Sequence, residues 1–132
     1  MENKMKRRLQ KILVVGLGLL CFSCYYDQLV EQEIPEIPMD TPISFSDDIQ
    51  PLFMIPGRDC TTCHNGTVAN PDLREGNAYA AIVGLIVPGD AESSNFFNAL
   101  PGNNHPVGAG FLLTVDEIAL IKGWIDRGAE NN

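Results

Sequence analysis

Two cysteines and a histidine lie within five consecutive residues of this chain, Cys60-Thr61-Thr62-Cys63-His64. Their side chains offer two sulfur nucleophiles and one imidazole, a common protein ligand for transition metals. Residues three apart lie on the same side of a helical turn, so a turn over this segment would point both sulfurs the same way. The segment can therefore attach a group through two sulfurs and coordinate a metal in that group through His64.

The same spacing, C-x-x-C-H, is the attachment pattern of c-type haem. Two thiols must add to the two vinyl groups on one edge of haem, and Cys60 and Cys63 have the separation for this reaction. His64 is then expected to be the proximal ligand of the haem iron. The sequence predicts one covalently attached haem c.

Three other uses of the cysteines are compatible with the residues. A redox-active dithiol would require a thioredoxin-like pattern of strands and helices, which the sequence does not show. A disulfide between the two cysteines is the second alternative. The third is a tetrahedral zinc site, for which two of the four donors would be adjacent in sequence: Cys60, Cys63, His64 and His105. The five-residue motif together with an export signal favours haem.

The elements that would position this motif are predicted to be helices. The clearest follows Thr114-Val115-Asp116-Glu117, a capping box with Thr114 as N-cap and Glu117 as the third helical residue. Apolar side chains then recur at helical spacing, and Gly128 supplies the stop: Ile118, Ile121, Trp124 and Ile125. Further helices are predicted from about residue 46, with Ile49, Leu52 and Phe53 on one face, and over 79–83 and 93–100. No strand pattern is evident, so we expect an all-α fold.

This order of elements resembles the monohaem class I c-type cytochrome fold, and in particular the small bacterial, planctomycete-type cytochrome c domains. The stretches that carry the resemblance are 44–53, the haem motif, 113–118 and Trp124-Ile125-Asp126-Arg127-Gly128-Ala129. The resemblance covers about residues 44–129. It implies a cytochrome c domain over residues 44–132, with about three to five helices around one covalent haem.

One position departs from that family. The distal iron ligand there is usually a methionine followed by proline, shortly before the C-terminal helix. The matching stretch here is Asn104-His105-Pro106-Val107, and the methionines beyond the N-terminal signal, Met39 and Met54, both precede the haem motif. His105 is therefore the candidate distal ligand, and the alternative is a solvent-facing loop histidine. Imidazole is a stronger donor than a thioether, so a bis-histidine haem should have the lower potential.

The N-terminus has the parts of an export signal. Residues 2–11 are basic, and 12–22 form an apolar run that is too short for a transmembrane helix. Ser23-Cys24 resembles the end of a bacterial lipobox, in which the cysteine becomes lipidated, although Cys21 stands where leucine is usual. Residues 1–23 are thus predicted to be a lipoprotein signal peptide, with ordinary cleavage or an uncleaved anchor as alternatives. We expect an exported protein, lipid-anchored through Cys24 to a bacterial membrane and facing the periplasm or cell surface.

Residues 24–43 are rich in acid and proline and are predicted to be an extended tether. Removing residues 1–23 leaves 4 basic and 16 acidic side chains, a net charge near −12. Such a surface repels nucleic acid and favours a basic partner protein. Of the remaining basic residues, Arg58 and Arg74 are candidates to pair with haem propionates, and the alternative for each is an ordinary surface charge.

These features predict a membrane-tethered monohaem cytochrome that carries single electrons between exported redox partners and is not an enzyme. Two strong axial ligands, His64 and His105, would leave no open position on the iron. The alternative is a haem enzyme or sensor subunit with an open distal iron site, in which His105 would be a base rather than a ligand.

Overall fold

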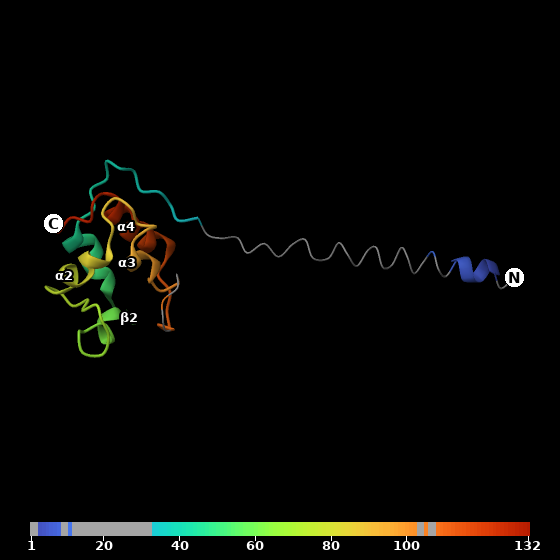
Figure 1. Ribbon diagram of the computed structural model, residues 1–132, viewed down its shortest axis with the longest axis horizontal. Helices are drawn as coiled ribbons and strands as arrows, with labels where there is room; N and C mark the ends of the chain where they lie inside the picture. The colour runs from blue at the N-terminus through green and yellow to red at the C-terminus, as the bar shows by residue number, and fades with distance from the viewer. Residues whose placement is uncertain (1–2, 9–10, 12–32, 103–104, 106–107) are drawn as a thin grey trace. The chain divides into compact units, whose positions relative to one another are not determined.

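The computed structural model describes residues 3–8, 11, 33–102, 105 and 108–132, and the chain divides into two units, 1–32 and 33–132 (Figure 1). In the first unit residues 3–8 are helical. Most of the rest of the predicted signal peptide, together with Cys24, lies outside the described residues. No helix among the described residues is long and apolar enough to cross a membrane.

The second unit begins with a helical stretch that runs directly into a hairpin. A π-helix, η1 (Phe45–Ile49), continues as a 3-10 helix, η2 (Gln50–Phe53). The Ser44 hydroxyl caps the start of this stretch by accepting from the Asp47 amide at 3.3 Å. The hairpin strands, β1 (Met54–Ile55) and β2 (Arg58–Asp59), then lead into a second 3-10 helix, η3 (Cys60–Thr62).

Four further helices follow: α2 (Ala78–Ile82), η4 (Val83–Leu85), α3 (Asn95–Asn98) and α4 (Val115–Asp126). The start of α4 is the predicted capping box, because Glu117 N donates to Thr114 Oγ1 at 3.2 Å and Thr114 N donates to Glu117 Oε2 at 2.8 Å. Gly128 follows the end of α4 with a φ of 105°. The predicted C-terminal helix is confirmed, and the other predicted helices correspond to shorter helical segments.

The expectation of an all-α, cytochrome c-like fold is wrong, because β1 and β2 form a two-stranded antiparallel sheet. Met54 pairs with Asp59 and Ile55 with Arg58 across it. The turn between them is Pro56-Gly57, with proline's fixed φ followed by a glycine at φ 81°, the sequence of a type II turn. The sequence shows no strand pattern here, because strands of two residues leave no alternation to detect. The fold is a small mixed one in which short helical pieces outweigh the sheet.

An aromatic cluster closes the core between η1, α2 and α4. The ring of Phe45 lies 5.3 Å from that of Tyr79 and 5.2 Å from that of Trp124, measured between centroids. Trp124 is buried, and its indole nitrogen donates to the Glu130 carbonyl at 2.9 Å. The helical stripe predicted for α4 is therefore ordinary core, and Cys60 at the start of η3 packs at the edge of this core rather than within it.

The end of the predicted tether lies against α4. Ile43 is buried, and Ile34 and Ile37 pack on the core. The Arg127 guanidinium donates to the carbonyls of Ile37 at 3.1 Å and Pro38 at 2.7 Å. Residues 33–43 are thus part of the folded unit that carries the haem motif.

Candidate haem-binding site

The haem motif forms one helical turn, as the spacing predicts. Asp59 caps η3, since its Oδ1 accepts from the amide and the hydroxyl of Thr61 at 2.9 and 2.6 Å. The carbonyl of Cys60 then accepts from the amides of Cys63 at 3.2 Å and His64 at 2.8 Å. A turn closed in this way places side chains three apart on the same side, which is the arrangement that attachment through two sulfurs requires.

Both cysteines of the motif are free thiols, so the structure does not contain the disulfide between them. Cys60 is half-buried and Cys63 is exposed. Burial raises the pKa of the Cys60 thiol because it disfavours the thiolate, and the neighbouring Asp59 carboxylate adds to this. The two sulfurs therefore differ in reactivity, and Cys63 is the more accessible nucleophile.

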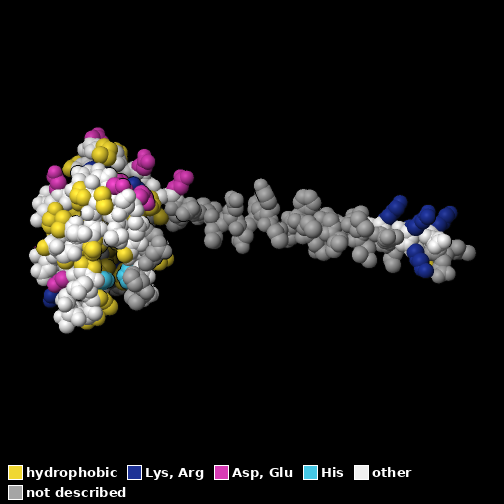
Figure 2. All heavy atoms as spheres, in the orientation of Figure 1, with side chains coloured by type: hydrophobic (Ala, Val, Ile, Leu, Met, Phe, Trp, Pro, Cys, Tyr) yellow, Lys and Arg dark blue, Asp and Glu magenta, His cyan; other side chains and the backbone are white. Residues whose placement is uncertain are grey.

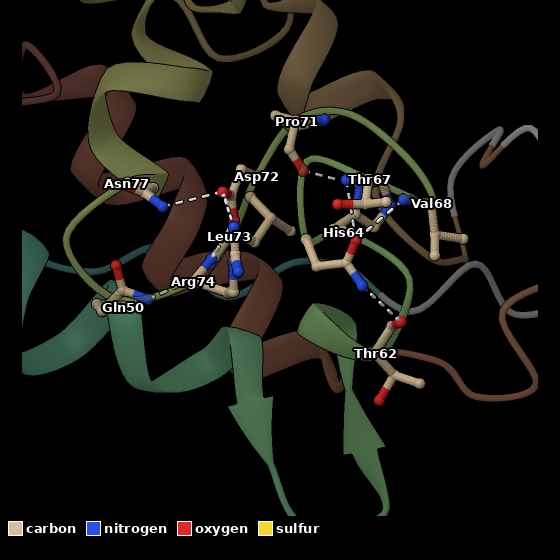
Figure 3. A network of polar contacts seen from close by, with 11 residues as sticks. Gln50, Thr62, His64, Thr67, Val68, Pro71, Asp72, Leu73, Arg74 and Asn77 are labelled. Atoms are coloured by element: carbon tan, nitrogen blue, oxygen red, sulfur yellow. Dashed lines mark hydrogen bonds and ion pairs between the residues drawn. The ribbon is translucent and has the colours of Figure 1, made fainter.

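His64 is oriented by a backbone carbonyl a short distance along the chain. Its Nδ1 lies 3.1 Å from the Pro71 carbonyl oxygen (Figure 3). A carbonyl only accepts, so this nitrogen carries the proton and Nε2 keeps its lone pair for a metal. The His64 carbonyl accepts from the Leu73 amide at 2.9 Å, and the buried Gln50 side chain donates to the Leu73 carbonyl at 3.1 Å. The segment that follows the motif is thus fixed to η2.

Asn65 is a supporting residue that our sequence interpretation missed. Its Oδ1 accepts from the amides of Thr67 at 3.0 Å and Val68 at 2.9 Å, and its Nδ2 donates to the Thr62 carbonyl at 3.3 Å (Figure 3). Gly66 follows at a φ of 73°. An Asn-Gly pair is a turn signal in its own right, so the dipeptide directly after the motif was the available clue.

The structure brings His105 to His64. The ring centroids are 6.0 Å apart, the ring planes are inclined by 82°, and His105 is half-buried. A metal–imidazole bond is about 2 Å long, and ring bonds of about 1.33 Å put the nitrogen roughly 1.1 Å from the ring centre. Two imidazoles on opposite sides of one metal therefore have centroids roughly 6 Å apart. The observed separation fits two axial ligands of one iron.

Two cavities adjoin the two imidazoles. One has a volume of about 150 Å³ and largely apolar walls that include Phe53, Phe96 and Leu100. The other has a volume of about 710 Å³ and is walled mainly by the motif and the His105 segment. Figure 2 shows the histidine side chains at a hollow with hydrophobic surroundings. Both cavities share four lining residues: Cys60, His64, Asn70 and His105. Space with apolar walls beside free thiols and facing imidazoles suits haem.

The walls of these cavities are almost free of charge. Among the described residues that line them, Asp59 is the one charged side chain. In the sequence, neither 60–71 nor 93–115 contains an Asp, Glu, Lys or Arg. On the face seen in Figure 2, most acidic side chains lie apart from the histidines.

Arg58 and Arg74, the candidate partners of haem propionates, are engaged elsewhere. Nη1 and Nη2 of Arg58 each donate to a carboxylate oxygen of Glu117 at 2.7 Å. Arg74 donates to Asp72 at 2.9 and 2.7 Å (Figure 3). The arginines lower the pKa of each carboxyl, since the hydrogen-bonded ion pair favours the charged form. The structure commits both cations to carboxylates of the chain.

Among the residues that the structure describes, no group of three His, Cys, Asp or Glu side chains is arranged to hold a metal ion. The four donors of the zinc alternative, all of them described, do not converge on one point in this way. Comparison of the chain with protein families, with curated proteins and with solved structures finds no match.

Proposed function

We propose that this protein is a membrane-tethered monohaem c-type cytochrome that carries single electrons between exported redox partner proteins. The observation that carries the proposal is the proximity of two imidazoles, with His64 and His105 6.0 Å apart between centroids. Beside them, one helical turn presents two free thiols at the haem-attachment spacing. The thiol pair and the histidine pair are each compatible with other sites. Together they would supply two thioether attachments for haem and two ligands for its iron.

The residues take separate roles in holding the cofactor. Cys60 and Cys63 would hold haem c through thioethers, His64 would be its proximal ligand and His105 its distal ligand. Haem supplies an iron that alternates between ferric and ferrous states. The Pro71 carbonyl holds the proton on Nδ1 of His64, which would leave Nε2 to bind the metal and would increase the basicity of the ring.

A haem held by both His64 and His105 would serve electron transfer rather than catalysis, because no position on the metal would remain for a substrate. The apolar walls of the smaller cavity, which include Phe53 and Phe96, exclude water from one side. Apolar walls disfavour the extra positive charge of ferric haem and would raise the potential. Two imidazole ligands favour the ferric state and would lower it.

The partners and the location are part of the same proposal. The chain beyond residue 23 is strongly acidic, which favours a redox partner with a basic contact surface. The lipobox-like Ser23-Cys24 would anchor the protein to a bacterial membrane on the periplasmic or outer side. An exported location also fits attachment of haem through Cys60 and Cys63. Cysteine pairs of cytoplasmic proteins stay reduced and more often serve metal binding or catalysis.

The experiment that tests the proposal is spectroscopy of the exported protein in ferric and ferrous forms, together with His105→Ala and His105→Met. We expect covalent haem with a low-spin, bis-imidazole spectrum in the wild type. His105→Ala should give a high-spin spectrum and bind carbon monoxide, whereas His105→Met should restore a low-spin spectrum at a higher potential. A high-spin wild type would favour a haem enzyme or sensor, and a protein without covalent haem would overturn the proposal.

A further inference from the structure

A bidentate ion pair joins the residues before the haem motif to the first turn of α4. Arg58 lies in β2, two residues before Cys60, and donates from Nη1 and Nη2 to the two carboxylate oxygens of Glu117, each at 2.7 Å. The side chains are 28% and 13% exposed, so most of the pair is removed from solvent. Two parallel hydrogen bonds fix the relative orientation of the groups as well as their separation.

The same pair holds the chain segment that follows His105. Arg58 Nη1 also donates to the Leu112 carbonyl at 3.4 Å. Glu117 Oε2 accepts from the Thr114 amide at 2.8 Å, so the end of this segment is fastened to the carboxylate that Arg58 binds. Between these points, Leu113 packs against the core and lines the same cavity as His105. Arg58 is therefore in contact with both ends of the stretch 112–117.

We propose that Arg58 and Glu117 form a clamp that sets the spacing between the two histidine-bearing segments and so positions His105 opposite His64. On one side of the clamp, β2 continues directly into η3 and the haem motif. On the other side, the segment from His105 ends at the clamped residues 112–117. The inference rests on the proposed function, because positioning His105 matters when it is an axial ligand.

The clamp differs from the other ion pairs that involve arginine or lysine in this unit. Arg74 and Asp72 are two residues apart, and Lys122 and Asp126 are four apart on one helix face. Lys122 also reaches Glu92, but by a single contact of 4.0 Å rather than by a bidentate pair. Arg58 and Glu117 are 59 residues apart, so their pair joins segments that the chain does not hold together locally. The capping box of α4 uses Thr114 and Glu117 alone, and the cap therefore gives no reason for the arginine.

The test compares haem-loaded, full-length Arg58→Gln, Glu117→Gln and the double variant with the wild type. Glutamine at 117 keeps the capping box, since either residue type serves at that position. Lys122→Gln is the matched control, because it removes one positive charge together with the ion pairs of Lys122 to Asp126 and Glu92. Arg58→Lys is the conservative variant, which retains the charge but not the fork geometry.

Two rates are measured. The first is displacement of the distal ligand by cyanide in the ferric protein, followed optically. The second is chymotryptic cleavage after Phe111 or Leu112, which does not depend on haem and tracks local opening of the segment. Both should rise about tenfold in Arg58→Gln and in Glu117→Gln, with no further rise in the double variant, because the two residues act as one unit. Arg58→Lys should recover part of the loss, and Lys122→Gln should match the wild type.

Unchanged rates in both single variants, or an equal rise in Lys122→Gln, would overturn the clamp. If Arg58→Gln does not accumulate, Glu117→Gln and Arg58→Lys carry the same comparison. A wild type that is high-spin or lacks haem would contradict the proposed function instead. In that case faster cleavage in the clamp variants alone would still support the clamp, and unchanged cleavage would refute it.

Discussion

The two histidines are held by contacts of very different range. His64 is oriented by the Pro71 carbonyl, and its own carbonyl accepts from Leu73, so its direct partners lie within nine residues. The segment of His105 is fastened at residues 112–117 to Arg58, which is 59 residues from Glu117. Contacts between residues close in sequence require little loop closure, whereas distant ones depend on the rest of the fold. The proximal side is therefore prepared locally, and the distal side depends on the whole domain.

The largest expected effect comes from removing each histidine in turn. His64→Ala should reduce covalent haem content at least about tenfold, because it removes the last residue of the attachment motif. His105→Ala should retain covalent haem and lose only the low-spin spectrum. Haem content per protein, measured as the pyridine haemochrome, checks both. Equal loss of haem in the two variants would remove the distinction between a local and a distant ligand.

A smaller effect should follow loss of the Gln50 side chain, which ties the proximal segment to η2. Gln50→Ala leaves the Leu73 carbonyl without its donor in a buried place, and we expect a loss of about 1–3 kcal/mol in the free energy of unfolding. Denaturant titration measures this loss. Cyanide displacement of the distal ligand should keep its wild-type rate, and a marked rise would show that the proximal anchor also supports His105.

Asn65→Ala should have a milder consequence. The substitution removes the acceptor for two amides in the turn after the motif, and we expect a cost of about 1 kcal/mol. Asn65→Asp keeps an acceptor at the same position and is the control. Thermal unfolding of the two variants decides the point, since equal stability would mean that the turn forms without the side chain.

The smallest effect concerns pH and the distal side. Arg58 lowers the pKa of Glu117, so the folded protein holds this carboxylate ionised more strongly than the unfolded chain does. The resulting stabilisation is fully present above the ordinary glutamate pKa and is lost as the pH falls through the lowered value. Wild type should therefore lose more stability than Glu117→Gln between pH 6 and pH 3. Parallel curves from denaturant titrations would contradict the assignment.

The sequence was informative where a feature depends on neighbouring residues. The capping box at Thr114 and Glu117 and the helical turn of the motif are both local, and both are confirmed. The hairpin at 54–59 was not predicted, because strands of two residues show no alternation of apolar and polar residues. The π-helical form of η1 likewise has no sequence pattern of its own. The pairing of Arg58 with Glu117 joins distant segments, whereas the sequence suggested a haem propionate or solvent as the partner of Arg58.

The candidate site shows the same difference between local and distant features. The spacing from Cys60 to His64 was enough to predict a helical turn, whereas the approach of His105 to His64 was suggested by sequence position and is seen only in the folded chain. The docking of residues 33–43 on the core, through Ile43 and the contacts with Arg127, was missed, because acid and proline dominate that stretch and obscure its core-packing isoleucines.

The nearly uncharged cavity walls have a consequence for ionic strength. At 0.15 M salt the Debye length is about 8 Å, so acidic side chains farther than this from the cavity mouth are largely screened. Anionic and cationic electron donors should then react at nearly equal rates, since Asp59 is the one charged residue in the described part of the cavity lining. At low salt the acidic side chains of the whole domain are no longer screened, and the cationic donor should react much faster than the anionic one. The protein would thus select its partner by charge at a distance and by shape at contact.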